Sequence, residues 1–236
     1  MPHFDSSEQL NRYVAERSNG VCLLSFSGGK DSVASWLHLR RSFSRVIPVY
    51  LYLVPRLSFV EESLRYFEEQ FGSHILRLPH PSLYRMLNSF VFQPPENCAA
   101  IESLQLPEYD YDDAFEVAKD IYDVPGCYTA IGVRATDSLN RWASIKQHGP
   151  LNEKRKTFYP IYDWSKDRLI AEIKRSGLKL PKAEYEMFGR SFDGLDVRFL
   201  KPIRDCYPED FVRILEFFPL ADIELARHEY REAYYG

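Results

Sequence analysis

Residues 25–33 read SFSGGKDSV and follow directly on the apolar run VCLL at 21–24. An uninterrupted apolar run of this kind predicts a strand buried within a parallel sheet. The residues that follow, DSVASWLHLRR from Asp31 onward, predict a helix. The stretch therefore predicts a glycine-rich loop between the carboxyl end of a strand and the start of a helix, which is where parallel sheets bind ligands.

The residue types of this loop suit a phosphate group. Gly28 and Gly29 allow the backbone to approach an anion closely, and the start of a helix offers N–H groups and a partial positive charge. Lys30 adds a full positive charge, while Ser27 and Ser32 add hydroxyl groups. A plain glycine turn with a capping serine is the simpler alternative, but the flanking strand and helix favour an anion site.

Asp31 is the acidic member of the loop. A carboxylate beside a polyphosphate makes chemical sense if it holds Mg²⁺ or orients a hydrogen-bond donor. The sequence therefore predicts Asp31 as the metal ligand of the site.

The rest of the chain predicts an alternation of strands and helices. Strands are expected at 20–26, 45–54, 74–79 and 127–133, and helices at 61–72, at 111–123, from Ser165, at 208–218 and near the C-terminus. The segment 81–110 predicts one helix and a proline-rich loop that covers a site. Alternation with short connections predicts an α/β fold, a parallel sheet flanked by helices, with a helical C-terminal region.

Composition limits the class of protein. With 236 residues, 45% of them hydrophobic and 27% charged, the chain suits one α/β domain, alone or with a small appendage. The net charge of −4 argues against a protein that coats nucleic acid, although a locally basic groove remains compatible with it. No apolar stretch reaches the roughly 20 residues of a membrane span, and the N-terminus lacks the apolar core of a signal peptide. We therefore expect a cytoplasmic protein.

Cysteines and histidines give no metal-binding pattern. The four cysteines are dispersed and form no C-x-x-C pair: Cys22, Cys98, Cys127 and Cys206. A zinc ribbon, a sequence-local iron–sulfur motif and a thioredoxin-like dithiol all lack their usual spacing. The six histidines also lack ligand spacing, so we expect packing or surface roles for them.

The loop resembles the PP-loop of the ATP pyrophosphatases, a superfamily with the adenine nucleotide α-hydrolase-like (HUP-type) fold. Its spacing is too short for the G-x-x-x-x-G-K-[ST] loop of kinases and GTPases. Three further stretches resemble segments of the phosphoadenosine phosphosulfate (PAPS) reductase family: VYLYLVPRLSFVEESLRYFEEQFG at 49–72, IGVRATDSLNRW at 131–142 and FYPIYDWSKDRLIAEIKRSGL at 158–178. With the loop, they cover about residues 20–200 in the order of the family.

The resemblance implies an ATP-dependent enzyme. Members of the superfamily bind the β,γ-pyrophosphate of ATP with Mg²⁺ and cleave between the α and β phosphates, which gives pyrophosphate and an adenylated substrate or AMP. It implies a PP-loop domain over 1–200 with a helical extension over 201–236 packed on it. The expected nucleotide-binding residues are Ser25, Ser27, Gly28, Gly29, Lys30, Asp31 and Ser32 in the loop, Tyr50 and Leu51 at an adenine slot, and Gly132 and Arg134.

Lys30, Arg134 and Arg141 are the expected catalytic residues. Arg134 follows the strand at 127–133, so its guanidinium is expected to point into the carboxyl-end crevice and grip an α-phosphate or a second anion. Arg141 lies seven residues further on and is expected to flank it, and Asp137 is expected to pair with one of the two arginines. A surface ion pair is the alternative for Arg141 and Asp137.

The chain departs from the PAPS reductase pattern at two places. Val54-Pro55-Arg56 stands where the family has aspartate-threonine-glycine, and the Glu-Cys-Gly-Leu-His run with the catalytic cysteine is missing near the C-terminus. Cys206 is the only late thiol, and we expect it to be structural. Sulfonucleotide reduction is therefore not expected, and the dispersed cysteines also argue against iron–sulfur-dependent thiolation of tRNA or sulfur insertion into DNA.

Several acceptors for the AMP group remain open. They are a flavin, as in FMN adenylyltransferases, sulfate, as in the small subunit of ATP sulfurylase, and a nucleobase or nucleic acid modified by an accessory enzyme. A nucleotide-binding regulatory module without turnover is the non-enzymatic alternative, but the complete set of lysine, aspartate and serines favours an enzyme. The aromatic C-terminus YREAYYG (230–236) predicts a docking surface for a protein partner or a second copy.

Overall fold

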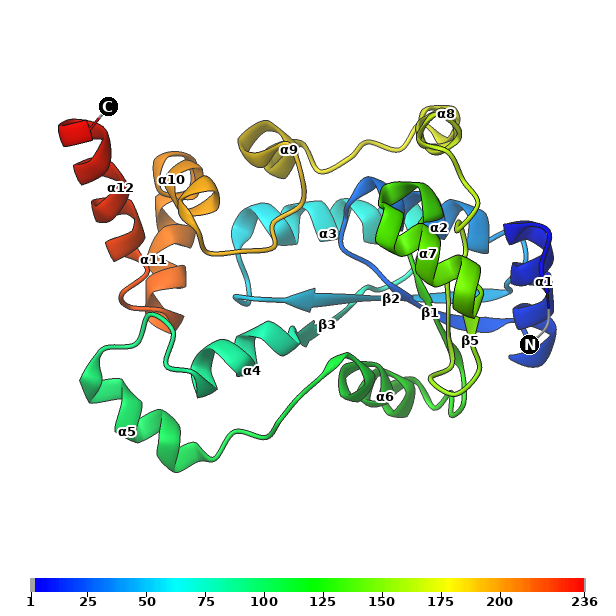
Figure 1. The fold of residues 1–236 in the computed structure, drawn as a ribbon, viewed down its shortest axis with the longest axis horizontal. Helices are drawn as coiled ribbons and strands as arrows, with labels where there is room; N and C mark the ends of the chain where they lie inside the picture. The colour runs from blue at the N-terminus through cyan, green and yellow to red at the C-terminus, as the bar shows by residue number, and fades with distance from the viewer. Residues whose placement is uncertain (1–2, 236) are drawn as a thin grey trace. The chain divides into compact units, whose positions relative to one another are not determined.

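The structure, a computed structural model, describes residues 3–235. Within these residues one six-stranded sheet has the strand order β3-β2-β1-β4-β6-β5 (Figure 1). The central strand β1 pairs in parallel with β2 and β4, β4 pairs in parallel with β6, and β5 runs antiparallel to β6. The predicted α/β class, a largely parallel sheet with helices on both faces, is confirmed.

The strands are β1 (Val21–Ser25), β2 (Arg45–Tyr52), β3 (Leu76–Pro79), β4 (Tyr128–Ile131), β5 (Leu151–Asn152) and β6 (Thr157–Phe158). The helices are α1 (Ser7–Arg17), α2 (Lys30–Leu39), α3 (Ser58–Phe71), α4 (Pro81–Asn88), α5 (Pro95–Leu104), α6 (Tyr111–Tyr122), the 3-10 turn η1 (Ala135–Asp137), α7 (Leu139–His148), α8 (Lys166–Ser176), α9 (Lys182–Phe188), α10 (Val197–Cys206), α11 (Pro208–Phe217) and α12 (Asp222–Tyr235). The first four strands lie within the predicted ranges. None of the helices within residues 3–235 has both the length and the apolar character that crossing a bilayer requires.

The chain forms two compact units, each built from separated segments. Unit 1 contains the residues up to Leu51, Tyr66–Leu78 and Phe115–Leu180. Unit 2 contains Tyr52–Arg65, Pro79–Ala114 and the residues from Pro181 onward. The sequence-based division at residue 200 stays a prediction.

In unit 1 both faces of the sheet are packed. On one face Leu23, Ile47 and Val49 pack with Phe115 and Ala118 of α6. On the other face α2 packs on β1 and β4, and α8 packs on α2 (Figure 1). Because β1 is buried on both sides, its sequence is apolar at consecutive positions rather than at alternate ones.

An aromatic cluster fixes α2 on the sheet. Phe26, the residue after β1, contacts Phe67 and Phe71 edge-on, with ring centroids 5.1 and 5.3 Å apart, and Phe71 stacks on Trp36 of α2 at 3.7 Å. Such contacts hold their partners in a defined geometry. The start of α2, where the predicted phosphate loop ends, is therefore anchored to the core of unit 1.

Predicted helix boundaries are found at two places in unit 1. Ser165 caps α8, since its hydroxyl accepts a hydrogen bond from the Arg168 amide at 3.1 Å. Gly72 follows the last residue of α3 with a φ of 61°, a conformation that favours glycine. Both signals are local, which is why the sequence reveals them.

The expectation of a single helix in 81–110 is wrong. Two helices form there, α4 and α5, with Pro95 as the first residue of α5. Proline cannot continue a helix, but it fits the first position because its missing N–H would have no partner there. The proline-rich stretch therefore starts a helix instead of forming only a loop.

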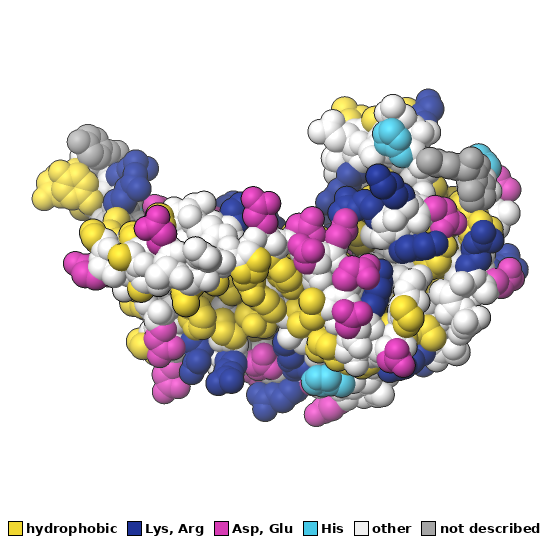
Figure 2. Space-filling view, turned by 90° about the horizontal axis from the view of Figure 1, so that it is seen from below, with side chains coloured by type: hydrophobic (Ala, Val, Ile, Leu, Met, Phe, Trp, Pro, Cys, Tyr) yellow, Lys and Arg dark blue, Asp and Glu magenta, His cyan; other side chains and the backbone are white. Residues whose placement is uncertain are grey.

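Unit 2 has its own core. Helices α9, α11 and α12 pack on α10, and the rings of Phe59, Phe188, Phe192 and Phe199 contact one another. The buried Asp210 carboxylate accepts hydrogen bonds from the amide and hydroxyl of Ser58 and so caps the start of α3. The surface of this unit also exposes Phe90, Leu104 and Tyr111, and Figure 2 shows hydrophobic side chains gathered around α4.

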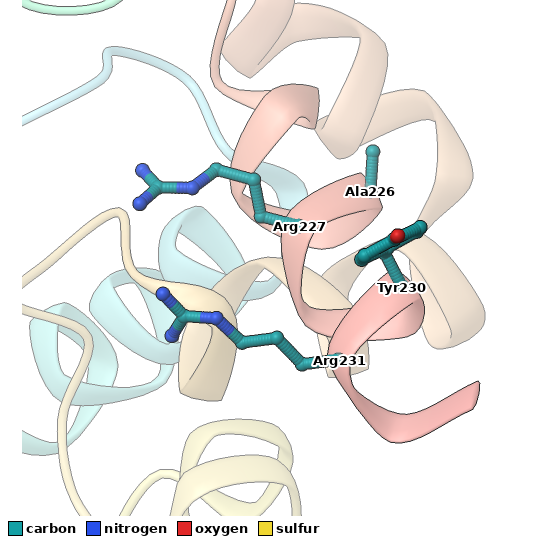
Figure 3. A pocket seen from close by; sticks show the side chains of 4 residues that line it. All are labelled: Ala226, Arg227, Tyr230 and Arg231. Atoms are coloured by element: carbon teal, nitrogen blue, oxygen red, sulfur yellow. The ribbon is translucent and has the colours of Figure 1, made fainter. Parts of the chain in front are cut away.

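The aromatic C-terminus is exposed in unit 2. Tyr230 and Tyr234 lie on the outer side of α12 with ring centroids 4.4 Å apart. Arg227 and Arg231 project together from the helix, and with Ala226 and Tyr230 they line a shallow pocket (Figure 3). Gly236, the last residue of the predicted docking segment, lies outside the described residues, and its docking role stays a prediction.

Glu184 of α9 is expected to make folding pH-dependent. Its side chain is 3% exposed and its Oε2 has no hydrogen-bond partner among the described residues, so burial raises its pKa to about 8. Because the folded state holds this proton more tightly than the unfolded chain does, stability should fall as the pH rises from about 4.5 to about 8, by up to roughly 1.4 kcal/mol per pH unit.

Urea unfolding of Glu184→Gln and of the wild type, measured across pH 5–8, checks this expectation. The amide keeps the shape of the protonated carboxyl, so the variant should lose this part of the pH dependence. Glu186→Gln, on the same helix but exposed, is the matched control and should behave like the wild type. A Glu184→Gln profile parallel to that of the wild type would show that Glu184 does not titrate as expected.

Candidate nucleotide-binding site

The SGGKDS loop lies at the carboxyl end of β1, as predicted. The Phe26 amide donates to the carbonyl of Val49 at 2.9 Å, so pairing with β2 continues to the first residue of the loop. Gly28 then adopts a φ of 70°, in the left-handed region that favours glycine. After this turn α2 begins at Lys30, so the loop joins the central strand directly to a helix start.

Two serines shape the loop from within. The Ser32 hydroxyl donates to the Gly29 carbonyl at 2.9 Å and accepts from the Ser27 amide at 3.3 Å. Ser27 Oγ accepts from the Gly29 amide at 3.3 Å. Ser32 is buried and Ser27 is exposed, so Ser32 fixes the loop while Ser27 stands where a ligand can reach it.

The start of α2 suits an anion. The first amides of a helix have no carbonyl partner one turn earlier, and Gly29, which precedes α2, supplies no capping side chain. The aligned peptide dipoles of the helix also favour negative charge at this end. The residues present therefore fit a bound phosphate group.

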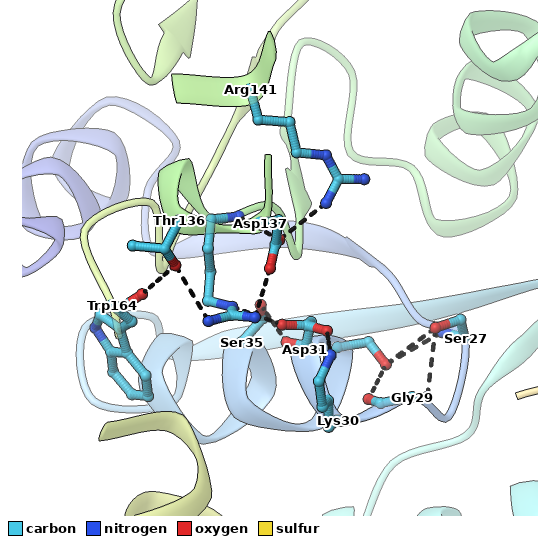
Figure 4. Close-up of polar contacts among 11 residues, drawn as sticks. Ser27, Gly29, Lys30, Asp31, Ser35, Thr136, Asp137, Arg141 and Trp164 are labelled. Carbon is cyan, nitrogen blue, oxygen red and sulfur yellow. Dashed lines mark hydrogen bonds and ion pairs between the residues drawn. The ribbon is translucent and has the colours of Figure 1, made fainter. Parts of the chain in front are cut away.

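Arg134 follows the carboxyl end of β4 and contacts Asp31 of the loop; Asp31 and its neighbours in the loop are drawn in Figure 4. The Arg134 side chain is only 4% exposed, and Nε donates to Asp31 Oδ1 at 2.8 Å. A second nitrogen donates to Asp137, and a third lies 3.3 Å from the Thr136 hydroxyl. Arg134 thus lies beside the loop, with Asp31 as a partner that the sequence did not predict, and its contact with a phosphate stays a prediction.

Five charged side chains of unit 1 are joined by successive ion pairs into one network. Lys30 pairs with Asp31, Asp31 with Arg134, Arg134 with Asp137, and Asp137 with Arg141, whose Nη1 lies 2.9 Å from Asp137 Oδ2. Asp137 was expected to pair with one arginine, and it pairs with both. Three cations and two anions leave an excess of positive charge, which suits a negatively charged ligand.

Gly132 allows β4 to pass close to α2. A Cβ at this position would lie 3.0 Å from the carbonyl oxygen of Asp31 and 3.1 Å from the Ser35 hydroxyl. That hydroxyl donates to the same carbonyl at 2.8 Å. A side chain at this position would crowd the backbone of α2, so glycine favours the close approach that brings Arg134 to Asp31.

Tyr50 and Leu51 lie near the carboxyl end of β2, beside the start of the loop. Tyr50 is buried, and Leu51 packs on the hydrophobic core beside Val49. Their position next to the loop is as expected, and their role at an adenine slot stays a prediction.

Thr136 and Trp164 belong to the site and were missed. The Thr136 hydroxyl donates to the carbonyl of Trp164 at 3.2 Å, and the Trp164 indole, which is fully buried, donates to the Ser7 hydroxyl at 3.1 Å. Thr136 thereby ties the arginine segment to the start of α8. In the sequence, the position of Thr136 between Arg134 and Asp137 is the only indication that it contributes to the site.

Asp31 is the loop carboxylate predicted to hold Mg²⁺, and this role stays a prediction; its two oxygens form ion pairs, Oδ1 with Arg134 and Oδ2 with Lys30. Within residues 3–235 no cluster of three or more His, Cys, Asp or Glu side chains is suited to a metal ion. A nucleotide-bound Mg²⁺ needs no such cluster, because one or two carboxylates and the phosphates hold it. Asp31 Oδ2 contacts Lys30, whose long chain can move toward a phosphate, so the donor set fits the ion.

Comparisons with known proteins give likeness of structure only. No protein-family model and no curated protein sequence matches the chain. Similar solved structures include the U34-tRNA thiolase NcsA from Methanococcus maripaludis with its [4Fe-4S] cluster, at 12% identity and a TM-score of 0.45, covering 92% of this chain and 78% of that one. The NH3-dependent NAD synthetase from Campylobacter jejuni has 13% identity and a TM-score of 0.46, and the match covers 96% of this chain and 94% of that one.

A third similar structure is a 4-thiouridine synthetase in complex with RNA and bound ATP. It has 18% identity and a TM-score of 0.42, covering 85% of this chain and 54% of that one. At such identities and TM-scores the likeness carries no information about chemistry. The function therefore has to be inferred from the loop and the charged network.

Proposed function

We propose that the protein is a PP-loop ATP pyrophosphatase of the PAPS reductase-like group. It binds ATP with Mg²⁺, cleaves between the α and β phosphates, transfers AMP to an acceptor and releases pyrophosphate. One observation supports this most strongly: the buried Arg134 is bonded to Asp31 of the loop. This bond brings a second cation to the helix start that already carries Lys30.

The loop is proposed to hold the leaving pyrophosphate. The amides at the start of α2 and the Lys30 ammonium group stabilise the negative charge that grows on the β-phosphate as its bond to the α-phosphate breaks. The exposed Ser27 hydroxyl adds a donor, while Ser32 keeps the loop in shape. The loop thus binds most strongly the group that becomes more negative during the reaction.

The two arginines are proposed to act on the α-phosphate. Arg134 has five N–H donors, and its contacts with Asp31, Asp137 and Thr136 leave donors for a ligand. Arg141 is half exposed, and Asp137 forms ion pairs with both Arg141 and Arg134. Mg²⁺ held by Asp31 would neutralise charge on the phosphate oxygens.

The residue types in the network of ion pairs from Lys30 to Arg141 favour an acceptor that is already an anion. Its members are lysine, arginine and aspartate in ion pairs, without a histidine that would take up a proton near neutral pH. A phosphate of a flavin mononucleotide, sulfate or a phosphate of a nucleic acid satisfies this condition. We further propose that the protein acts in the cytoplasm.

Turnover of ATP labelled in the α-phosphate tests the proposal. The protein is incubated with Mg²⁺ and, in separate arms, no acceptor, FMN, sulfate or a single-stranded oligonucleotide, and the labelled products are resolved. AMP or an AMP adduct together with pyrophosphate is the expected result. ADP as the main product would contradict cleavage between the α and β phosphates, and tight ATP binding without turnover in every arm would favour a regulatory module.

A further inference from the structure

Helix α7 is exposed along its whole length. It contains no buried residue, and two of its large apolar side chains, Leu139 and Trp142, are 85% and 51% exposed. Its first turn is held by the Ser138 cap, which accepts from the Arg141 amide at 3.2 Å, and by the ion pair of Arg141 with Asp137. The helix is therefore fixed at its start and presents its remaining side chains to solvent.

The region around α7 is basic although the chain is acidic. Residues 138–162 contain five Lys and Arg against the single acidic residue Glu153, whereas the whole chain has a net charge of −4. The five are Arg141, Lys146, Lys154, Arg155 and Lys156. Lys156 contacts Glu153, and Arg141 contacts Asp137, which directly precedes this segment. With both acidic residues counted the segment keeps an excess of positive charge, on α7 and on the turn between β5 and β6.

Trp142 combines with this charge. Lys146 Nζ lies 4.7 Å from the centre of the Trp142 ring, which places a cation beside a half-exposed aromatic surface. Such pairs of aromatic rings and cations bind nucleic acid without base pairing: the ring stacks on a base and the cation contacts the phosphate backbone. A duplex offers the phosphates but keeps its bases stacked on each other.

We propose that α7 and the β5–β6 turn form a docking surface for single-stranded nucleic acid, and that a terminal phosphate of the bound strand is the acceptor. One oxygen of this phosphate bonds to the α-phosphorus of ATP as the bond to the β-phosphate breaks, and pyrophosphate leaves. Charge complementarity fits a polyanion, and the half-exposed indole favours unpaired bases over an acidic peptide, which offers carboxylates but no matching planar rings. The acceptor role rests on the proposed function, whereas the docking surface stands on α7 itself.

The docking surface is continuous with the nucleotide site in unit 1. Arg141 belongs to α7 and, through Asp137 and Arg134, to the charged network that ends at Lys30 of the loop. A strand that contacts Trp142 and Lys146 on α7 therefore lies beside the arginine proposed to act on the α-phosphate.

Intrinsic fluorescence gives a direct test, because Trp142 is the exposed tryptophan. The other two, Trp36 and Trp164, are 5% and 0% exposed, so a soluble quencher such as acrylamide reaches mainly Trp142. The full-length protein is titrated at low salt with a twelve-residue oligouridylate, the matching single-stranded DNA and a duplex of equal length. Single strands should quench Trp142 and protect it from acrylamide, and the duplex should do so much less.

Two variants separate stacking from charge. Binding by the variants is followed through the anisotropy of a fluorescein-labelled oligonucleotide, because Trp142→Ala removes the fluorescent reporter. Trp142→Ala should weaken binding at least about fivefold, the lower bound for the loss of one stacked base. Lys146→Ala should reduce the slope of log affinity against log salt by about 0.7, the value for one phosphate contact in a single strand. Tyr230→Ala and Lys182→Ala, exposed residues of unit 2, are the matched controls and should bind like the wild type.

Folding is not at risk in these variants, since α7 buries none of its side chains, and circular dichroism verifies it. The proposal is overturned if no oligonucleotide changes the quenching of Trp142, or if Trp142→Ala binds as tightly as the wild type. Equally tight, Trp142-dependent binding of polyglutamate would assign the surface to an acidic protein partner. Concentration-dependent association lost in Trp142→Ala would assign it to a second copy of the chain.

The acceptor role is tested separately with ATP labelled in the α-phosphate. The oligonucleotide carries a 5′-phosphate, and transfer of labelled AMP to it with release of pyrophosphate is the expected result; the same oligonucleotide with a 5′-hydroxyl should bind but accept no label. Binding without transfer, while another acceptor is adenylated, would overturn the acceptor role and leave the docking surface standing. Binding without any cleavage of ATP would count against the proposed function instead.

Discussion

Replacing Arg134 with alanine is expected to lower the stability of the protein and to abolish most of its ATP cleavage. The guanidinium is 4% exposed and bonded to the carboxylates of Asp31 and Asp137. Its removal leaves two partly buried negative charges without this partner, and the loss of one member of a buried ion pair costs about 3–5 kcal/mol. We expect the lower end of this range, because both carboxylates keep some contact with water and a second cation each.

For activity, the loss of a donor aimed at developing charge typically lowers kcat by about 10²–10³. Urea unfolding measures the stability, and AMP release from labelled ATP measures the activity. Arg134→Lys restores the charge without the planar fork, so it should recover part of the stability but little of the activity.

Arg168→Ala is the matched control for Arg134→Ala, since it removes an arginine whose ion pair with Glu8 is 40% exposed. Such pairs contribute about 0–1 kcal/mol, and the contact of Arg168 with the Trp164 ring at 4.4 Å adds about 0.5–1 kcal/mol. Arg168 is not part of the ion pairs that join Lys30 to Arg141, so stability should fall by less than in Arg134→Ala and ATP cleavage should not change. If Arg134→Ala were as stable and as active as Arg168→Ala, the central role of Arg134 would be wrong.

The strands and the loop of unit 1 could be predicted because their signals are local. The apolar run that became β1 is uninterrupted, and the one that became β4 is interrupted only by Thr129, as suits central parallel strands. The glycines at 28–29 stand directly between β1 and a helical pattern. Topology then brings the carboxyl ends of these strands together, with Ser25 paired to Ile131. This is why Arg134 could be placed near the loop without knowledge of the structure.

The partner of Arg134 could not be predicted in the same way. Asp31 lies 103 residues away, and the contact depends on the close passage that Gly132 allows between β4 and α2. Distances of this kind follow from the packing of the whole unit. A sequence read locally therefore predicted only the nearby pairing of Asp137.

Helix α7 was missed for a physical reason. Hydrophobic periodicity reveals a helix through its buried face, and α7 has none. The strands β5 and β6 are two residues each, too short for any periodic pattern. The sequence of this basic segment therefore did not predict its helix and strands, although its positive charge is evident from the residue types.

Replacing Lys30 with alanine is expected to remove activity while leaving the fold intact. Its side chain is 36% exposed, and Asp31 keeps its bond to Arg134 when Lys30 is lost, so no carboxylate is left unpaired. The change in stability should stay within about 1 kcal/mol. The loss of a cation at the leaving pyrophosphate should lower AMP and pyrophosphate formation by about 10²–10³.

Comparison of Lys30→Ala with Arg134→Ala distinguishes an effect on the reaction from an effect on the stability of the fold. Lys30→Ala should affect the reaction alone, whereas Arg134→Ala should affect both reaction and stability, because only Arg134 is buried between two carboxylates. Lys30→Arg keeps a positive charge at the loop and should retain more activity than Lys30→Ala. Full activity of Lys30→Ala would refute the assignment of the loop as the pyrophosphate site, since Lys30 is the lysine of the SGGKDS loop.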